Sequence, residues 1–336
     1  MSKETKKKRD IKQEATDLIV KQIEEGTIPW RKPWDDGLAG FSLPRNGGSN
    51  RPYRNLNTII LMGHPGYIET GDPRFYTFNQ VQANNWKVIK GSKSVHAYFF
   101  KKIEVDNEEP KEGEEDKKKI PMLKTYPLFH ASQIEGCPEY KPDTIPQPEW
   151  QKPLRVKAML DASGAQIGIG GNRAFYDPVR DRIQLPPEGA FKSELDWSST
   201  ALHESAHWTG HKDRLDRQFG KFGDPQYARE ELRAELASVF LSMELGIEPD
   251  FSQHASYVEN WAEILKEDKN EIFRAASDAQ KISDYMMQYA PELSTDAELA
   301  AAAGMPEHLM EELGIDNPVN NPPFDVSAPV YGGPSL

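Results

Sequence analysis

The stretch SSTALHESAHWTGH, residues 198–211, decides how the rest of the chain is interpreted. His203 and His207 are four residues apart, so on a helix both imidazoles lie on one face, about one turn apart. Two imidazoles at this spacing can hold one ion, and a catalytic zinc site keeps its fourth position for water. Glu204 can then act as general base towards that water. The pattern predicts a zinc-dependent hydrolase, chiefly a peptidase, with another divalent metal as an alternative.

Three carboxylates compete to be the third protein ligand. Glu231 and Glu235 are four residues apart in YAREELRAELASVFL, residues 227–241, which has the pattern of an amphipathic helix. One of them can bind the metal while the other orients a histidine through its second ring nitrogen. Asp213 is the rival, because HESAHWTGHKD also fits an H-E-x-x-H-x-x-G-x-x-D spacing in which Gly210 permits a sharp turn. We favour Glu231 and keep Glu235 and Asp213 as alternatives.

Apolar periodicity predicts three helices around this motif. They cover about residues 194–210, 225–246 and 254–290. Upstream, AFYDPVRDRIQLPP at residues 174–187 predicts a short strand pair that turns at Asp177 and Pro178. The strand around residues 183–185 is a candidate edge for pairing with an extended substrate.

The N-terminal part has a mixed α and β pattern. A helical period runs from Asp10 to about Glu25. Strand-like alternation follows at residues 75–103, where Gly91 and Ser92 are predicted to turn a hairpin. LKTYPLFHASQIEG, residues 123–136, is expected to add a closing strand beyond an insertion.

The length of 336 residues favours two units over one core. We predict an α+β protein, in which a small α+β unit precedes a mainly helical unit with a short antiparallel sheet. The predicted segments are a disordered basic tail at 1–9, a first unit at 10–145 with a mobile acidic and lysine-rich insertion at 104–119, a linker at 146–153, a second unit at 154–312, and a disordered tail at 313–336.

Charge is distributed unevenly along the chain. The net charge is −12, but residues 1–103 hold 18 Lys and Arg against 10 Asp and Glu, so the remainder carries −20. A basic first part suits nucleic acid, although a solvated tail at 1–9 would also explain much of the surplus. With Cys137 alone no internal disulfide can form, and no stretch is apolar enough to span a membrane. We therefore expect a cytoplasmic protein with no membrane partner.

Aromatic and basic residues alternate in IPWRKPW, residues 28–34, as expected where bases stack on rings and cations follow phosphates. Tryptophans between prolines can equally fill a small core, and lysines on a hairpin can serve solvation. The candidate DNA-binding residues are Trp30, Arg31, Lys32 and Trp34, then Arg45, Arg51, Tyr53 and Arg54, then Lys87, Lys90 and Lys93.

Several of these segments together resemble one known family, the ArdC-type antirestriction proteins. ALHESAHWTGHKDRLDRQFG, YAREELRAELASVFLSMELGI and GGNRAFYDPVRDRIQLPP resemble its zincin-like metallopeptidase domain. IEEGTIPWRKPW, RPYRNLN and FYTFNQVQANNWKVIKGSKSV are similar to its N-terminal single-stranded-DNA-binding domain, which also heads some plasmid primases. The motifs occur in the family's order and span residues from about 10 to 290.

The resemblance implies what the protein does. It implies a protein of plasmids and other conjugative elements that binds single-stranded DNA, carries a zinc metallopeptidase site, and protects incoming DNA from host restriction. It implies His203, His207 and a glutamate of EELRAE as ligands and Glu204 as the catalytic residue. The protein substrate is unknown; a host restriction component or a DNA-bound protein would fit. The alternative is a non-catalytic DNA-binding or occluding protein with a structural or vestigial metal, whereas a nuclease is disfavoured by the acidic second part.

Overall fold

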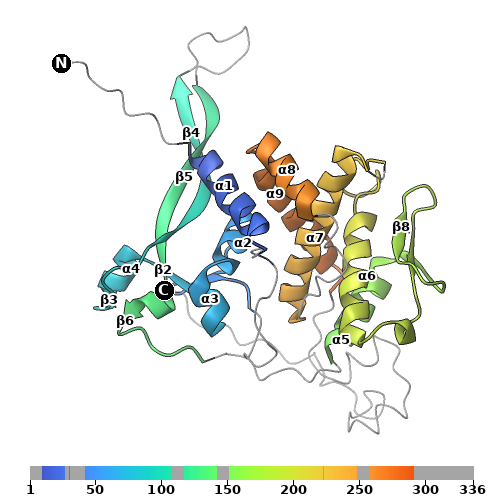
Figure 1. The fold of residues 1–336 in the computed structure, drawn as a ribbon, viewed down its shortest axis with the longest axis horizontal. Helices are drawn as coiled ribbons and strands as arrows, with labels where there is room; N and C mark the ends of the chain where they lie inside the picture. The colour runs from blue at the N-terminus through green and yellow to red at the C-terminus, as the bar shows by residue number, and fades with distance from the viewer. Residues whose placement is uncertain are drawn as a thin grey trace, which may run out of the picture.

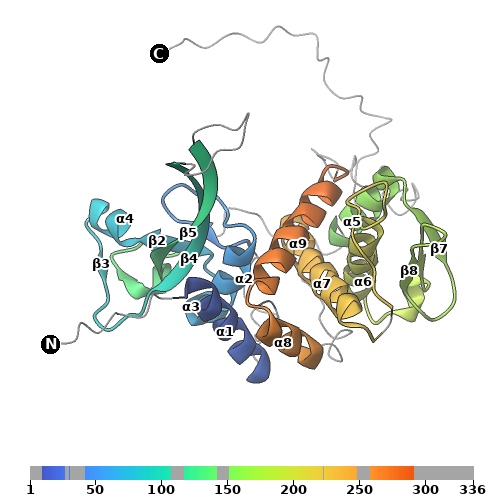
Figure 2. The ribbon, with the colours of Figure 1, turned by 90° about the horizontal axis from the view of Figure 1, so that it is seen from above.

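A computed structural model describes residues 10–26, 30, 42–106, 117–141, 151–221, 223–247 and 258–290. Figures 1 and 2 show an N-terminal part with a twisted sheet beside short helices, and a C-terminal part of stacked helices with a small sheet on its far side. The predicted α+β class is confirmed. The predicted tails at 1–9 and 313–336 lie outside the described residues, as do residues 146–150 of the predicted linker.

The main N-terminal sheet has four strands in the order β1-β2-β5-β4. They are β1 (Arg45–Asn46), β2 (Arg74–Thr77), β4 (Val95–Asp106) and β5 (Lys117–His130). The closing strand expected at residues 123–136 is confirmed in β5, which runs antiparallel to β4. β2 pairs with residues 128–130 of β5, so the rest of β5 continues with β4 as a two-stranded ribbon in the described part of the chain (Figure 1). Strand pairing extends into both ends of the predicted insertion, whose residues 107–116 lie outside the described part.

The hairpin predicted at Gly91 and Ser92 is wrong. β3 (Lys87–Val88) pairs with β6 (Ile134–Glu135) in a separate two-stranded sheet, while β4 pairs with β5. Gly91 does turn the chain, with a φ of +93°, but the strands on its two sides pair with other strands and not with each other. Alternation of apolar and polar residues predicts a strand with two different faces, but it does not predict which strand lies beside it.

Four helices and one 3₁₀ turn accompany these strands in the described residues of the N-terminal part. The helix predicted from residue 10 is confirmed as α1 (Ile11–Glu24). Asp10 caps its N-terminus, because the Asp10 carboxylate accepts a hydrogen bond from the backbone N–H of Gln13 at 3.1 Å. α2 (Leu56–Met62) was not predicted, because all its residues are buried and its apolar residues show no one-sided period. The remaining elements are α3 (Pro65–Thr70), α4 (Phe78–Ala83) and the 3₁₀ turn η1 (Ala131–Gln133).

The C-terminal part contains five described helices. Two of the predicted ones are confirmed as α6 (Glu194–Trp208) and α7 (Pro225–Leu245), which ends at Gly246 in the left-handed conformation. The helix predicted at 254–290 is two helices, α8 (Val258–Glu267) and α9 (Glu271–Met287), because the Asp268 carboxylate accepts the Asn270 backbone N–H at 2.8 Å and turns the chain. α5 (Gln151–Ser163) was not predicted and begins inside the predicted linker.

The small sheet beside α6 is mixed rather than antiparallel. β8 (Phe175–Asp177) and β9 (Arg182–Leu185) form the predicted antiparallel pair, and β7 (Gln166–Ile169) adds a parallel strand on the other side of β9. The strand order β7-β9-β8 makes β9 the central strand, so residues 183–185 are not the substrate-pairing edge that we predicted. The edges are β7 and β8. A 3₁₀ turn, η2 (Glu188–Ala190), leads to α6.

The two predicted units share one hydrophobic core. Ile19 of α1 and Ile59 of α2 belong to the same buried cluster as Phe240 of α7 and Ile272 of α9. Polar contacts join the same elements: the Thr16 hydroxyl donates to the Lys269 carbonyl at 2.9 Å. Figure 2 shows α1 packed along α8, and α2 beside α9. The N-terminal part is therefore packed directly onto the helices that support the motif.

Candidate metal centre

Helix α6 presents the motif to the interior of the C-terminal part. The Ser193 hydroxyl caps its N-terminus by accepting the Asp196 backbone N–H at 3.1 Å. His203, Glu204 and His207 are each less than a tenth exposed. Because α6 is covered by α5, α7 and the small sheet, even its polar side chains are removed from bulk water. Buried polar groups need partners, and here α7 supplies them.

α7 brings Glu231 to the two histidines. The Nε2 atoms of His203 and His207 are 3.1 Å apart, and the Glu231 carboxylate oxygens lie 3.5 and 3.6 Å from them. Ligand atoms about 2.1 Å from a tetrahedral zinc ion are about 3.4 Å apart, so these three donors have the separations of one coordination sphere. Among the His, Cys, Asp and Glu side chains of the described residues, these three form the only group close enough together to hold one metal ion.

The second ring nitrogens of the histidines face two more carboxylates of α7. His207 Nδ1 lies 3.3 Å from Glu230 Oε1, and His203 Nδ1 lies 4.0 Å from Glu235 Oε2. An imidazole that donates from Nδ1 to a carboxylate keeps a lone pair on Nε2. At His207, where Glu230 lies within hydrogen-bond distance of Nδ1, this lone pair faces His203 Nε2 at 3.1 Å. A cation between the two nitrogens removes their repulsion, so the donor set fits a bound divalent metal. Glu235, an alternative third ligand in the sequence, instead lies behind His203.

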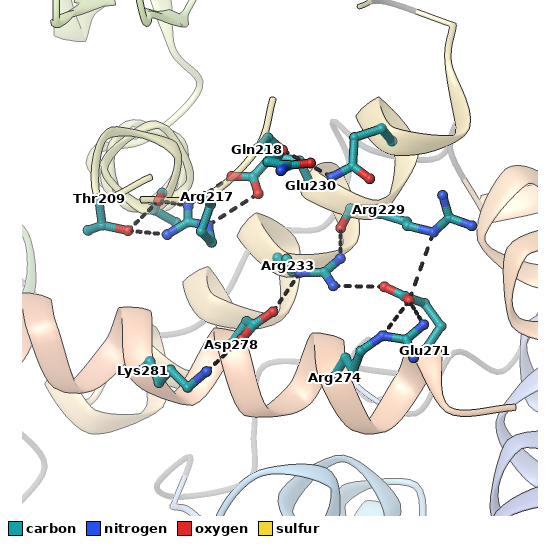
Figure 3. A network of polar contacts seen from close by, with 12 residues as sticks. Thr209, Arg217, Gln218, Arg229, Glu230, Arg233, Glu271, Arg274, Asp278 and Lys281 are labelled. Carbon is teal, nitrogen blue, oxygen red and sulfur yellow. Dashed lines mark hydrogen bonds and ion pairs between the residues drawn. The ribbon is translucent and has the colours of Figure 1, made fainter. Parts of the chain in front are cut away.

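Glu230 was not among the candidates from the sequence, and Figure 3 shows how Arg217 holds it. Arg217 donates to both of its carboxylate oxygens, from Nη2 at 2.8 Å and from Nε at 3.2 Å. The same guanidinium donates to the Thr209 hydroxyl at 2.8 Å and the Ala206 carbonyl at 2.6 Å, at the end of α6. Arg217 thereby ties Glu230 to the helix that carries His207. Adjacent glutamates of α7 point about 100° apart, and periodicity alone did not show which one meets which histidine.

The electrostatics of the site favour one positive charge among these side chains. Burial lowers the pKa of His207, but Glu231 and Glu230 outweigh burial and raise it to about 10. Burial raises the pKa of the Glu231 carboxyl, yet His207 and His203 hold it well below its usual range. Either a proton or a metal ion can supply the charge that these ionised carboxylates attract.

Glu204 is set apart from the other carboxylates by its surroundings. Burial raises the pKa of Glu204 despite the opposing effect of His203 and His207. A backbone hydrogen bond from Tyr176 of β8 also reaches this carboxylate. A carboxylate with a raised pKa next to a two-histidine site has the proton affinity that a general base needs.

Asp213 does not join the cluster. Its side chain is 72% exposed, and it lies 3.4 Å from His211 rather than beside His203 or His207. Gly210 does allow a close turn, since a Cβ there would lie 2.6 Å from the Phe219 ring. That turn brings Arg217 back towards Glu230 instead of bringing Asp213 to the motif.

Two of the predicted DNA-binding residues, Trp30 and Tyr53, are buried in the structure. Trp30 is fully buried and packs against Trp261 of α8, with ring centroids 6.3 Å apart. Tyr53 is 8% exposed, and its hydroxyl accepts a hydrogen bond from Asn46. Neither ring offers a face to a base, so the prediction that they bind DNA is wrong for both. Burying the large apolar surface of each ring stabilises the fold more than leaving it exposed on a loop would.

The basic candidates are distributed as follows. Arg54 forms an ion pair with Asp284 of α9, and Arg45 donates to the Asn50 side chain at 3.1 Å. Exposed positions are occupied by Arg51, Lys87, Lys90 and Lys93. Arg31, Lys32 and Trp34 lie outside the described residues.

A substitution at Glu230 tests its role behind His207. We expect Glu230→Gln to weaken Zn²⁺ or Mn²⁺ binding by about 10- to 100-fold, because the amide no longer fixes the imidazole tautomer by charge. Competition with a chromophoric chelator measures the affinity. Arg233→Gln is the matched control: Arg233 also lies on α7, but it pairs with Glu271 and Asp278 on the face turned to α9 (Figure 3). Equal losses in both variants would reduce Glu230 to a general structural role.

Comparison with protein families gives two matches in tandem. Residues 9–129 match the N-terminal domain of anti-restriction factor ArdC, and residues 154–278 match a zincin-like metallopeptidase family. No described helix is long and apolar enough to cross a membrane.

Two solved structures are similar to this chain over most of its length. The metal-free crystal structure of the antirestriction ArdC protein from the R388 plasmid is 38% identical, with a TM-score of 0.68 over 84% of this chain and 98% of that one. The Mn(II)-bound structure of that protein is 36% identical, also with a TM-score of 0.68, over 85% of this chain and all of that one.

Curated relatives include longer proteins. A DNA primase TraC of Escherichia coli is 40% identical over 304 residues, and a second one is 38% identical over 296. The match covers 84% of this chain in both cases, but the chain spans only 27% and 20% of the two primases. An uncharacterized protein of Sinorhizobium fredii, y4eC, is 31% identical over 82% of this chain and 91% of its own length.

Proposed function

The chain belongs to the ArdC family of antirestriction proteins, with a zincin-like C-terminal part, and from this premise we propose that it is a metal-dependent peptidase that binds single-stranded DNA. In this proposal the DNA-binding part places the peptidase site on entering DNA of a plasmid or conjugative element. Cleavage of a protein there protects that DNA from host restriction.

One observation carries the peptidase proposal: His203 Nε2, His207 Nε2 and the Glu231 carboxylate converge at separations of 3.1 to 3.6 Å, beside the buried Glu204. We assign the three converging residues as the metal ligands and Zn²⁺ as the metal. The donor set also suits Mn²⁺, which a relative binds, so the identity of the metal is part of the test. When bound, the metal polarises a carbonyl and makes a water molecule acidic.

The residues of this chain supply the remaining chemistry. Glu204 takes the proton of the attacking water and delivers it to the leaving amine, a role that its raised pKa supports. Glu230 lies within hydrogen-bond distance of His207 Nδ1 and orients that ring, while Glu235 lies 4.0 Å behind His203 Nδ1 and adds negative charge there. The free edge of β8 is the proposed place for an extended substrate, because the Tyr176 backbone reaches Glu204 from that strand.

The DNA-binding half of the proposal concerns the N-terminal part of the chain. It rests on the match of residues 9–129 and on the surplus of cations in residues 1–103. Cations that neutralise phosphates make affinity fall as salt rises. Fluorescence anisotropy of a labelled single strand at several salt concentrations tests this half by itself.

The Glu204→Gln variant separates the peptidase from a protein that only binds DNA. We expect it to retain metal and single-strand binding, while hydrolysis of unfolded casein falls by about 10²- to 10⁴-fold, because the general base is lost. Transfer of an unmodified plasmid into a restricting recipient should fall with it. If that variant, loaded with metal, protects the plasmid as well as the parent, the protein acts without catalysis and the metal is structural.

A further inference from the structure

The ribbon of β4 and β5 carries two exposed aromatic rings that its own core does not use. Phe99 is 42% exposed and Tyr126 is 45% exposed. Their centroids are 5.3 Å apart and their planes are nearly perpendicular, at 79°. A pair in this geometry covers only part of its ring surface, and large apolar faces left in water often mark a binding site.

The strand register places a cation beside the rings. Phe99 lies directly opposite Lys124, and Tyr126 lies opposite Ala97, two positions along the same face. Directly opposite side chains in an antiparallel pair have Cβ atoms about 5 Å apart. Lys124 forms no ion pair within the described part of the chain, so its charge is available to a ligand.

More unpaired cations lie where the chain enters the ribbon. Lys90 and Lys93 are exposed in the segment between β3 and β4, and the described residues provide neither with an acidic partner. From Lys93 to Phe99 an extended chain advances about 20 Å. Cations therefore lie at both ends of a path that passes the two rings.

We propose that single-stranded DNA binds along this face of the β4–β5 ribbon, with bases stacked on Phe99 and Tyr126 and phosphates near Lys124, Lys90 and Lys93. Rings that accept any base, flanked by cations, match the chemistry of an unpaired strand, whereas a duplex would hide its base faces from them. This placement rests on the DNA-binding half of the proposed function and names the surface on which the strand would bind. It also replaces Trp30 and Tyr53, whose rings are buried.

Phe100 provides a control within the same strand. It is 56% exposed, but alternation turns it to the opposite face, where it meets Phe273 of α9 at 6.1 Å and Lys12 at 6.0 Å. Replacing it removes a ring that is more exposed than Phe99 or Tyr126 from the same ribbon without touching the proposed path.

The experiment measures the affinity of the full chain for a fluorescent oligo-dT across a salt series. Phe99→Ala with Tyr126→Ala should lower affinity at least about tenfold. Phe99→Trp with Tyr126→Trp should retain it, and Phe100→Ala should leave it unchanged. Lys124→Ala should reduce the slope of log affinity against log salt by about 0.7. Thermal unfolding and metal content check that each variant is folded.

Contrary results separate this proposal from the wider one. If the parent binds oligo-dT and the double alanine variant binds it equally well, the strand lies elsewhere and only this placement fails. If the parent does not bind, the DNA-binding half of the proposed function fails together with it. If the double alanine variant loses self-association in sedimentation velocity while its DNA affinity is unchanged, the rings meet a second copy of the chain and the proposal is overturned.

Discussion

The Glu231→Ala variant is expected to lose more than about 100-fold of its affinity for Zn²⁺ or Mn²⁺, since even partners behind the ligands contribute 10- to 100-fold. The Glu231 carboxylate lies close to both histidines. The substitution removes its negative charge, which favours a cation at this buried position. Isothermal titration with each metal measures the loss. The metal-free variant should also show the His207 pKa falling, because Glu231 is the strongest of the charges that raise it.

Asp213→Ala is the control for this prediction, because Asp213 is the rival ligand in the sequence. Its exposed side chain lies beside His211, so metal affinity should not change. The reverse pattern, in which Asp213→Ala loses the metal and Glu231→Ala keeps it, would show that the loop after α6 rearranges on binding and that our third ligand is wrong.

Trp30→Ala should destabilise the folded protein by about 3–5 kcal/mol, the usual cost of truncating a large buried aromatic side chain. Its ring is fully buried against Trp261, so the substitution leaves a cavity between the N-terminal part and α8. Urea unfolding measures the change in free energy. Single-strand affinity of the folded fraction should stay near that of the parent, since the ring does not face solvent.

The comparison variant is Val179→Ala, because Val179 is 92% exposed and its loss should change stability by less than about 0.5 kcal/mol. A Trp30→Ala protein that is as stable as the parent but binds single strands poorly would return Trp30 to the DNA surface and contradict its place in the core.

Local signals were sufficient where the chain's own neighbours decide the structure. Helices α6 and α7 follow from apolar periodicity, with Ser193 and Gly246 at their ends. The signals failed where distant residues decide. α2 is buried on every side, so its apolar residues show no helical period. β3 pairs with β6, a strand that lies far from it in the sequence. Trp30 could not be assigned from its proline-rich surroundings, because α8 covers it from more than 200 residues away.

The same distinction applies to the site. The spacing of His203 and His207 predicts that they share a helix face, and the structure brings both to one point with Glu231. The rotation of α7 against α6 decides that Glu230 meets His207 and that Glu235 lies behind His203. A contact across two helices leaves no periodic trace in either one. Arg217, which holds Glu230, was not among the candidates for that reason.

The core shared by α1, α2, α7 and α9 means that folding and ligand binding are thermodynamically linked across the elements that this core joins. A metal ion that binds only the folded form stabilises it by RT ln(1 + [L]/Kd), and a common core spreads that gain to every element it holds together. If the site binds a divalent metal as proposed, the supply of that metal would therefore affect how much of the N-terminal part is folded. A substitution that loosens α1 would in turn weaken metal retention, without touching any ligand.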